Sequence, residues 1–252
     1  MIAVENVSHR IGGAAILTDV SLAIPRGGLT ALIGPNGAGK STLLSLVARL
    51  TPLQAGRVTV DGLDVSRTPS RDLARKLAIL RQDPAIAARL TVRDLVGFGR
   101  YPHSRGRPGL EDAAAVEAAI ERFALGPLAG RFLDELSGGQ RQRALVAMTF
   151  AQETDYILLD EPLNNLDMVF ARALMRALRA LADDAGRTIV VVLHEINYAA
   201  AWADHIVALR DGRVVGTGTP EAIVSTQALR AAFGTDIEVT RIAGRLVALH
   251  HA

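Results

Sequence analysis

The feature that most constrains the fold is a glycine-rich stretch placed directly after a short apolar run. Residues 34–42, GPNGAGKST, match the pattern G-x-x-x-x-G-K-[ST]; the run LTALIG (29–34) leads into them and STLLSLVARL (41–50) follows with helical character. Glycines let backbone N–H groups turn toward phosphate oxygens without a side-chain clash, and a helix N-terminus adds partial positive charge. The stretch therefore predicts a strand, a phosphate-binding loop and a helix in succession.

Individual side chains of the loop have predicted roles. Lys40 would reach the terminal phosphates of a nucleotide and the Ser41 hydroxyl would hold Mg²⁺; the other predicted nucleotide-binding residues are Gly34, Pro35, Asn36, Gly37, Ala38, Gly39 and Thr42. Lys40 is one of only two lysines among 28 basic residues, so a lysine-rich composition does not explain it. The alternative is a glycine-rich strand–helix turn without a ligand.

Three further apolar runs end in polar residues. They are LAILRQ (77–82), ending at Gln82, YILLDE (156–161), ending at Asp160 and Glu161, and TIVVVLHE (188–195), ending at His194 and Glu195. Short runs rich in Ile, Leu and Val indicate strands buried on both faces, as in a parallel sheet. Since ligands of open α/β sheets lie outside the carboxyl ends of the strands, we expect these polar residues beside the glycine-rich loop.

The polar strand ends suit phosphoryl transfer to water. Asp160 is expected to hold Mg²⁺, and Glu161 to orient and polarise the attacking water as a general base. His194 would donate a hydrogen bond to the γ-phosphate or the water, and Gln82 would bind Mg²⁺ or the water. Each has a structural alternative: a turn carboxylate, a structural histidine and a polar strand end. Glu195 is a weaker candidate base, because strand alternation should turn it away from the side that His194 faces.

Residues 84–151 predict a mostly helical insertion between two core strands. Thr91 and Asp94 have the spacing of a capping box, and EDAAAVEAAIERF (111–123) is alanine-rich with helical spacing. We predict a single domain over residues 1–252, with a catalytic core at about 1–83 and 152–252 and a helical subdomain at about 84–151. The N-terminal part to about residue 28, and the tail from VVGTGTP (214–220), predict short strands with turns.

The composition of the chain restricts the kinds of partner and the compartment that we expect. The chain has 252 residues, of which 49% are hydrophobic and 21% charged, as in a globular protein; without cysteine, disulfides and thiolate metal sites are excluded. The net charge is +2 and arginines alternate with acids, so we expect no nucleic-acid partner. No segment approaches the roughly 18 apolar residues of a membrane span, and the N-terminus lacks signal-peptide features. We expect a cytosolic protein whose membrane role, if any, comes through a partner.

A second glycine turn, ELSGGQRQR (135–143), lies about a hundred residues after the first. Ser137 and Gln140 have the spacing of a capping box, so a helix should begin here with free N–H groups facing an anion. An ordinary helix cap explains Ser137 and Gln140. It does not explain the glycine pair, because each glycine costs a helix about 1 kcal/mol.

Together, these motifs resemble the ATP-binding subunit of ABC transporters over nearly the whole chain. They are the loop at 34–42, Gln82, LSGGQRQR (136–143), YILLDEP (156–162), NNLD (164–167) and His194. The resemblance implies an α/β fold: a P-loop NTPase core with a mostly parallel sheet, an N-terminal antiparallel β-subdomain and an inserted helical subdomain. It also implies ATP and Mg²⁺ as cofactors, and hydrolysis of ATP to ADP and phosphate coupled to transport.

The resemblance also implies partners. Ser137, Gly138, Gly139 and Gln140, the signature, would close over ATP held by a second copy in a head-to-tail homodimer, and Asp167, in the D-loop, would link the two sites. Transmembrane permease subunits would dock a coupling helix on the helical insertion and the Gln82 loop. The chain would then lie peripherally on the cytoplasmic side of the inner membrane.

Two stretches, TVRDLVGFGRYPH (91–103) and DEPLNNLDM (160–168), look most like the ATPases of iron–siderophore importers. Haem or cobalamin importers, a soluble ABC ATPase not tied to transport, and a nucleotide-binding module without hydrolysis are the alternatives. The family usually stacks adenine on an aromatic residue where this chain has Ile11. The preference for adenine should therefore be weaker, unless His9 takes the aromatic residue's place.

Overall fold

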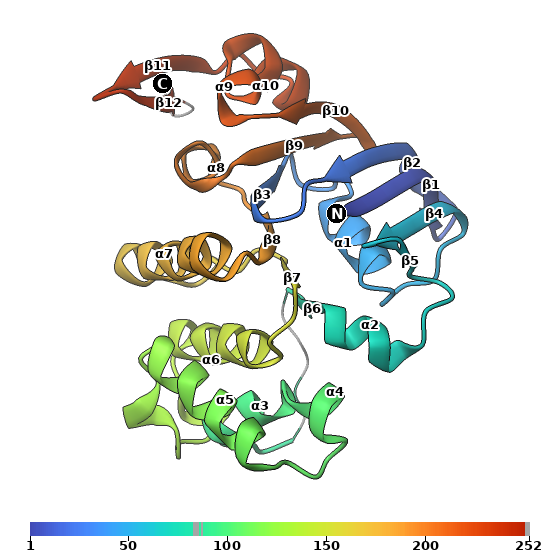
Figure 1. Cartoon of the computed structure of the whole chain (residues 1–252). Coiled ribbons are helices and arrows are strands. Elements are labelled where there is room, and N and C mark those ends of the chain that lie inside the picture. The colour runs from blue at the N-terminus through green and yellow to red at the C-terminus, as the bar shows by residue number, and fades with distance from the viewer. Residues whose placement is uncertain (83–85, 87, 250–252) are drawn as a thin grey trace.

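Three β-sheets and a group of helices make up the computed structural model, which describes residues 1–82, 86 and 88–249 (Figure 1). The first sheet is antiparallel, with the order β2-β1-β4-β5. Its strands are β1 (Ile2–Ile11), β2 (Ala14–Ile24), β4 (Ala55–Val60) and β5 (Leu63–Asp64). β1 and β2 are longer than the short strands predicted, because they pair along most of their lengths as a hairpin.

The second sheet has six strands in the order β10-β9-β3-β8-β7-β6. β3 (Gly28–Ile33), β6 (Leu77–Leu80), β7 (Tyr156–Leu159), β8 (Thr188–Val192) and β9 (His205–Arg210) run parallel, and β10 (Arg213–Gly218) pairs antiparallel at one edge. Every residue of β7 and β8 is buried, as the continuous apolar runs predicted. The parallel register brings the carboxyl ends of β3, β6, β7 and β8 to one edge.

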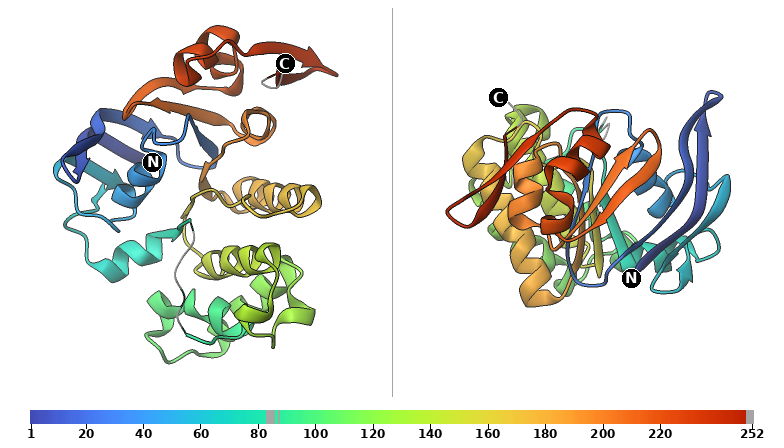
Figure 2. Two further views of the ribbon diagram at one scale, coloured as in Figure 1. Left: turned by 180° about the vertical axis from the view of Figure 1, so that it is seen from behind. Right: turned by 90° about the horizontal axis from the view of Figure 1, so that it is seen from above.

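The six-stranded sheet divides the core into two layers by the period-two alternation of its strands. Ile189 and Val191 pack in the cluster with α6 (Gly138–Ala151) and α7 (Met168–Ala185). Val190 and Val192 pack in the other cluster, with α1 (Lys40–Val47) and the antiparallel sheet. Figure 2 shows from above how helices cover one face of the parallel strands while α1 and the antiparallel sheet cover the other.

The helices between β6 and β7 lie together at the lower end of Figure 1. They are α3 (Val92–Phe98), α4 (Tyr101–Ser104), α5 (Leu110–Arg122) and α6, with α2 (Ser70–Lys76) preceding β6. The predicted capping box at Thr91 and Asp94 is present at the start of α3. The bounds 84–151 stay a prediction, and residues 84 and 85 lie outside the described residues.

Buried Arg100 fastens these helices to one another. Its Nε donates to Asp112 Oδ1 at 2.9 Å, near the start of α5, and its Nη1 donates to the Ala151 carbonyl at 2.8 Å and to Glu153 Oε2 at 2.7 Å, after α6. One guanidinium therefore joins the turn before α4 to two other helices. A planar group with five donors suits this arrangement.

The tail contains helices that the sequence prediction missed. α9 (Pro220–Ile223) and α10 (Thr226–Phe233) lie between β10 and the hairpin of β11 (Glu238–Ile242) and β12 (Arg245–Leu249). The prediction of strands and turns was therefore wrong for residues 220–233. The signals were Ser225, whose hydroxyl caps α10, and Gly234, which ends it in a left-handed conformation.

No helix in the described part of the chain is both long and apolar enough to span a bilayer. Helix α8 (Ile196–Trp202) follows β8, and two short 3-10 helices, η1 (Gly126–Leu128) and η2 (Leu133–Glu135), lie between α5 and α6.

Candidate nucleotide-binding site

The glycine-rich loop joins β3 to α1, and its backbone requires glycine. Gly34, Gly37 and Gly39 have φ values of 142°, 78° and 96°. A Cβ at position 34 would lie 2.0 Å from the carbonyl oxygen of Leu209. α1 begins at Lys40 with no side-chain cap and no acidic residue in its first turn. The N-terminus of α1 therefore lies directly at the glycine loop.

Lys40 is buried at the centre of this loop, with 5% of its surface exposed. Its Nζ donates hydrogen bonds to the carbonyl oxygens of Gly34 at 2.8 Å and Pro35 at 2.9 Å. Burial lowers the pKa of Lys40, and the nearby carboxylates of Glu161 and Asp160 oppose that effect. The ammonium group is therefore held where the loop curves around it.

Asp160 follows β7 directly and is buried, with 6% of its surface exposed. Its Oδ1 accepts a hydrogen bond of 2.9 Å from Ser41 Oγ, at the start of α1. Burial raises the pKa of Asp160, and the hydrogen bond from Ser41 opposes that rise. The sheet edge thus brings together two oxygen-bearing side chains, Ser41 and Asp160, that are far apart in the sequence.

A hydroxyl and a carboxylate oxygen fit Mg²⁺, which is bound by few protein ligands together with phosphate oxygens and water. Within the described ranges there is no group of three or more His, Asp or Glu residues that could hold a metal ion. Ser41 and Asp160 therefore fit a Mg²⁺ ion that takes its other ligands from phosphate oxygens and water.

Glu161 and His194 meet at the same edge. Glu161 Oε1 lies 2.6 Å from His194 Nε2, and its Oε2 accepts a hydrogen bond from Asn164 Nδ2 at 2.7 Å. The backbone of Glu161 has a φ of 51°, in the left-handed region that few non-glycine residues occupy. This conformation turns the chain sharply after β7 and directs the Glu161 carboxylate toward His194, which follows β8.

A cavity of about 450 Å³ joins these parts. It is lined by Ile11, Ile16, Asn36, Gly37, Ala38, Gly39, Lys40, Ser41, Thr42, Gln82, Glu161 and His194. The structure therefore brings the exposed side chain of Gln82 to the loop, along with Glu161 and His194, as the strand-end argument predicted.

Two expectations need correction. Glu195 does not line this cavity, but strand alternation is not the reason: β8 ends at Val192, and Glu195 is the N-cap of α8. His9 cannot take the place of an aromatic residue for adenine, because it is 3% exposed and packs inward from β1. The pairing of β1 with β2 shifts register between His9 and Arg10, and Ile11, the last residue of β1, is exposed while His9 is buried.

The second glycine turn lines a different cavity, of about 530 Å³. Its lining residues are Ser137, Gly138, Gly139, Gln140, Arg143, Asn165, Asp167 and Phe170, and none of them lines the cavity at Lys40. The predicted capping box is present: Ser137 Oγ accepts from the Gln140 backbone N–H and Gln140 Oε1 from that of Ser137. A Cβ on Gly139 would lie 3.2 Å from the Asn165 carbonyl oxygen, so glycine lets α6 approach the loop before α7.

Two residues of this second cavity escaped the sequence analysis. They are Arg143 and Phe170: the Arg143 guanidinium lies 4.0 Å from the centre of the Phe170 ring. The predicted residue Asp167 caps α7 by accepting a hydrogen bond of 2.9 Å from the Phe170 backbone N–H. The starts of α6 and α7 are thereby held together. The second arginine of RQR was a signal, but its partner lies 27 positions away and no local pattern connects them.

Comparisons with known proteins agree with this geometry. A family model described as ABC transporter matches residues 17–164. This chain belongs to the ABC transporter family. The petrobactin import ATP-binding protein YclP of Bacillus subtilis (strain 168) is 44% identical over 250 residues, 99% of each chain. The petrobactin import ATP-binding protein FatE of Bacillus anthracis is 47% identical over 241 residues, 96% of each chain.

Solved structures agree with the family assignment. An inward-facing putative metal-chelate type ABC transporter has a TM-score of 0.83 and 26% identity, covering 99% of this ABC transporter chain and 98% of its own. The dimeric ATP-binding cassette MJ0796 with ADP and Pi has a TM-score of 0.79 and 28% identity, covering 87% and 99%. The predicted family, the predicted α/β fold and the predicted ATPase activity are confirmed.

Proposed function

We propose that this chain is the ATP-hydrolysing subunit of an importer that moves a ferric siderophore through a membrane permease. The observation that carries the proposal is the similarity, over almost the whole chain, to two petrobactin import ATP-binding proteins at 44% and 47% identity. YusV of Bacillus subtilis (strain 168), a probable siderophore transport system ATP-binding protein, is 43% identical over 95% of this chain. In this proposal the chain lies peripherally on the cytoplasmic side of the membrane.

A haem importer is the second candidate. The hemin import ATP-binding protein HmuV of Bordetella pertussis (strain Tohama I) is 39% identical over 97% of this chain. Its identity is lower than the 44%, 47% and 43% of YclP, FatE and YusV, which favours the siderophore. Because the cargo contacts other subunits in this proposal, the choice between the two rests on uptake measurements.

In the proposed mechanism, the glycine loop and the start of α1 bind the phosphates of ATP. Lys40 exchanges the two loop carbonyls that now hold its Nζ for β- and γ-phosphate oxygens. Ser41 and Asp160 would hold Mg²⁺, which would neutralise charge on the phosphates. The backbone N–H groups fix the phosphate chain in line for attack.

Glu161 is the proposed general base. Its carboxylate takes a proton from a water molecule as the water oxygen forms a bond to the γ-phosphorus. The bond from the γ-phosphorus to the β,γ-bridging oxygen breaks, and ADP and phosphate leave. His194, whose Nε2 lies 2.6 Å from Glu161 Oε1 before nucleotide binds, exchanges that contact for a hydrogen bond that it donates to the γ-phosphate, and Gln82 orients the water.

The catalytic unit in this proposal is a homodimer. The cavity with Ser137 shares no lining residue with the cavity with Lys40, which supports a role for Ser137, Gly138, Gly139 and Gln140 at the ATP of a second copy. Beside Asp167, the apolar Met168 and Val169 are 80% and 73% exposed. A partner chain would cover this apolar surface, and dimeric MJ0796 supports the same assembly.

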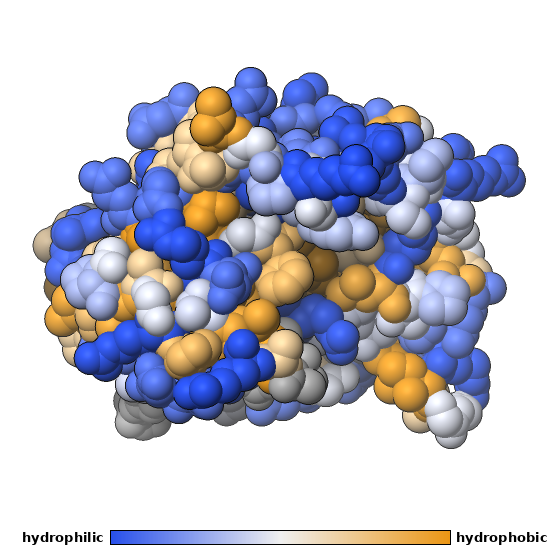
Figure 3. Space-filling model, turned by 90° about the horizontal axis from the view of Figure 1, so that it is seen from below, coloured by the Kyte–Doolittle hydropathy of each residue, from blue (hydrophilic) through white to orange (hydrophobic). Residues whose placement is uncertain are grey.

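The permease is proposed to dock on the helical face. A groove of about 470 Å³ runs along α3, α4 and α5, and exposed Phe98 and Tyr101 line it. Figure 3 shows this side of the molecule from below, with apolar residues gathered among hydrophilic ones. On α2, Arg71 and Arg75 each donate to the Pro102 carbonyl of α4 at 3.2 Å, so basic groups border the groove. An amphipathic segment fits this surface with its apolar face on Phe98 and Tyr101.

Uptake of a radiolabelled ferric siderophore by cells that lack this gene tests the proposal. The intact chain should restore uptake and Lys40→Ala should not, and the chain should co-purify with a permease from detergent-solubilised membranes. Unchanged siderophore uptake in the deletion strain, together with lost haem uptake, would replace the proposal by the haem alternative.

A further inference from the structure

His194 lies on a short segment whose backbone is held at both ends. Strand β8 ends just before it, and the backbone N–H of Leu193 donates to the Leu32 carbonyl of β3 at 3.1 Å. On the other side, Glu195 is the N-cap of α8, and its carbonyl accepts a hydrogen bond of 3.1 Å from the backbone N–H of Tyr198. The position of the exposed imidazole therefore depends on where α8 is held.

Helix α8 is too short to keep its position without support. It has 7 residues, and isolated helices of fewer than about 12 residues are marginal in water. The hairpin of β11 and β12 is short as well, and a two-stranded hairpin alone is only marginally stable. The two elements pack together through β12, with the hairpin above α8 in Figure 1. Each element therefore stabilises the other.

One side chain joins α8 to the hairpin by two hydrogen bonds. Asn197 Nδ2 donates to the Ala248 carbonyl at 3.2 Å, and Asn197 Oδ1 accepts from the Ala248 backbone N–H at 2.8 Å. The side-chain amide thus pairs with β12 as the peptide group of a neighbouring strand would. Ala248 is 2% exposed and packs in the same buried cluster as Ile196 and Ala199 of α8. The two bonds therefore form beside apolar side chains, where a hydrogen bond is stronger than in water.

We propose that Asn197 is a positioning residue for His194, and that through it the hairpin of β11 and β12 takes part in ATP hydrolysis. The inference rests on the proposed role of His194 at the γ-phosphate. Asn197 is the second residue of α8 and lies three positions after His194, so a displacement of this turn also moves the imidazole. Among the described residues of the hairpin, none lines the cavity at Lys40, so the hairpin acts through α8.

Asn197→Leu tests this in the purified full chain, because leucine keeps the approximate size of the side chain and removes both hydrogen bonds. The kcat for hydrolysis of Mg²⁺–ATP should fall about tenfold, since a hydrogen bond to the γ-phosphate needs a correct distance and angle. The Kd for ATP should change by less than about twofold, because the phosphate loop is untouched. Gln227→Leu, at an exposed amide of α10, is the matched control and should leave kcat within about twofold of the intact chain.

Two further measurements separate positioning from a general loss of stability. In a His194→Ala chain, Asn197→Leu should lower the single-turnover rate by less than about twofold, because the group that it positions is gone. In protein with ¹³C-labelled histidine, Asn197→Leu should shift the NMR signal of the His194 imidazole and leave those of His9 and His103 in place. If Asn197→Leu does not fold, Asn197→Asp, which keeps the acceptor and removes the donor, takes its place in each measurement.

The outcomes distinguish this inference from the proposed function. An unchanged kcat in Asn197→Leu, a tenfold loss that persists in the His194→Ala chain, or an unmoved His194 signal would overturn the inference and leave the ATPase mechanism intact. An intact chain without ATPase activity, in which Asn197→Leu still shifts the His194 signal, would instead overturn the proposed function and uphold the contact between the hairpin and His194.

Discussion

Lys40 shows how much of the site is set by one residue. Its ammonium is buried and satisfied by two loop carbonyls, so the charge is already desolvated and positioned before a nucleotide arrives. In the proposed mechanism this charge stabilises phosphate once Lys40 exchanges its two carbonyl partners for phosphate oxygens. The positive φ values of Gly34 and Gly39 shape the loop around the ammonium group of Lys40.

Replacing Lys40 tests this directly. Lys40→Ala removes the buried cation that faces the phosphates and should weaken ATP binding by at least about 100-fold, to no detectable binding at micromolar nucleotide. The measurement is titration with a fluorescent ATP analogue. Lys76→Ala, at the only other lysine, is the control and should bind normally; equal loss in both variants would show that net charge, and not the loop lysine, matters.

At the scale of elements, the crossing of α3 and α6 depends on a glycine. A Cβ on Gly99, at the end of α3, would lie 2.1 Å from the Met148 carbonyl oxygen of α6, whereas a Cβ on Gly97, within α3, would meet nothing within 4 Å. The two positions are two residues apart and differ only in what lies beside them. The close approach explains why GFGR contains two glycines with unequal roles.

The two alanine variants should have opposite effects on stability. Gly99→Ala forces α3 away from α6 and should lower the free energy of unfolding by about 2 kcal/mol or more. Gly97→Ala should raise it by about 0.5–1 kcal/mol, because alanine favours a helix interior. Urea unfolding measures both. Equal effects would mean that the α3–α6 contact is looser than the structure shows.

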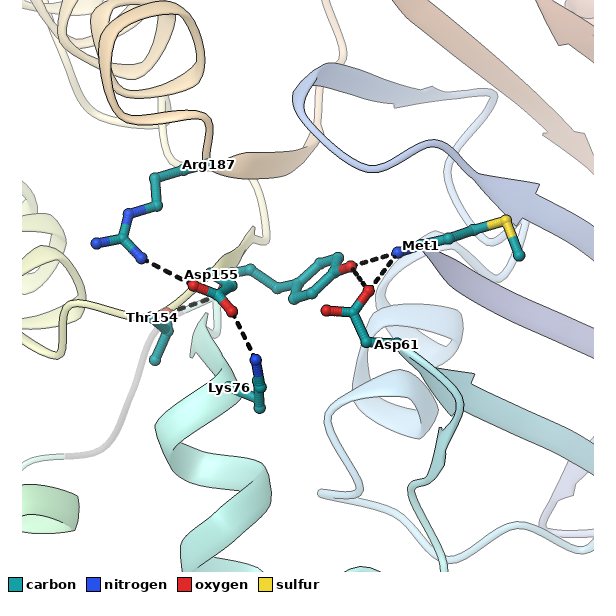
Figure 4. A network of polar contacts seen from close by, with 7 residues as sticks. Met1, Asp61, Lys76, Thr154, Asp155 and Arg187 are labelled. Atoms are coloured by element: carbon teal, nitrogen blue, oxygen red, sulfur yellow. Dashed lines mark hydrogen bonds and ion pairs between the residues drawn. The ribbon is translucent and has the colours of Figure 1, made fainter.

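Another junction of elements is polar, and Figure 4 shows it. Asp155, just before β7, binds Lys76 of α2 at 2.7 Å and Arg187, just before β8, at 3.1 Å. Beyond Tyr156, which accepts a hydrogen bond from the Met1 amino group and donates one to Asp61, the same network reaches β1. The starts of two central strands are therefore joined to a helix and to the antiparallel sheet.

Asp155→Asn should cost about 1 kcal/mol of stability near neutral pH, a modest value because the pairs are partly exposed. The hydrogen bond from Lys76 lowers the pKa of Asp155 below its ordinary value. The unfolded chain, with a pKa of about 3.9, then binds the proton more readily than the folded chain. The difference between the two proteins should stay constant from pH 7 to pH 5 and shrink as the pH falls below about 4.

Urea titrations of both proteins at several pH values measure this difference. Asp184→Asn, at an exposed carboxylate of α7, is the control and should change stability by less than about 0.5 kcal/mol at each pH. A difference for Asp155→Asn that grows toward low pH would contradict the sign of the shift.

At the scale of the whole molecule, the two glycine turns line cavities that share no residue. The loop at Lys40 and the turn at Ser137 each lie at the start of a helix, and we propose that they are two halves of one site. Two copies related by a two-fold axis would repeat each contact and complete two sites at once. Bound ATP would then hold the copies together, and hydrolysis would release them.

Glu161→Gln should therefore trap a dimer. The amide keeps the shape of the side chain but cannot take a proton from water, so ATP persists at both interfaces. Gel filtration with light scattering in Mg²⁺ and ATP should show a stable dimer at micromolar protein, and a monomer with ADP. Glu195→Gln, at the adjacent carboxylate that does not line the cavity, should keep turnover and form no lasting dimer. A monomer of Glu161→Gln under ATP would contradict the shared site.

Local sequence determined the parts of this protein that obey local rules. The glycine loop, the capping boxes at Thr91 and Ser137 and the buried parallel strands all follow from residue type and spacing, because turn conformation, cap bonds and the alternation of side chains depend on near neighbours. The meeting of Asp160, Glu161 and His194 also followed, since parallel strands must end at one edge.

Only the tertiary structure decided which distant residues share a surface. The inward direction of His9, the stacking of Arg143 on Phe170 and the separation of the two glycine turns into different cavities depend on how strands and helices pack across tens of positions. The same holds for Gly99, whose neighbour is the backbone of another helix. Such contacts arise from the filling of a common core, in which each element's position depends on all the others, and no window of sequence contains that information.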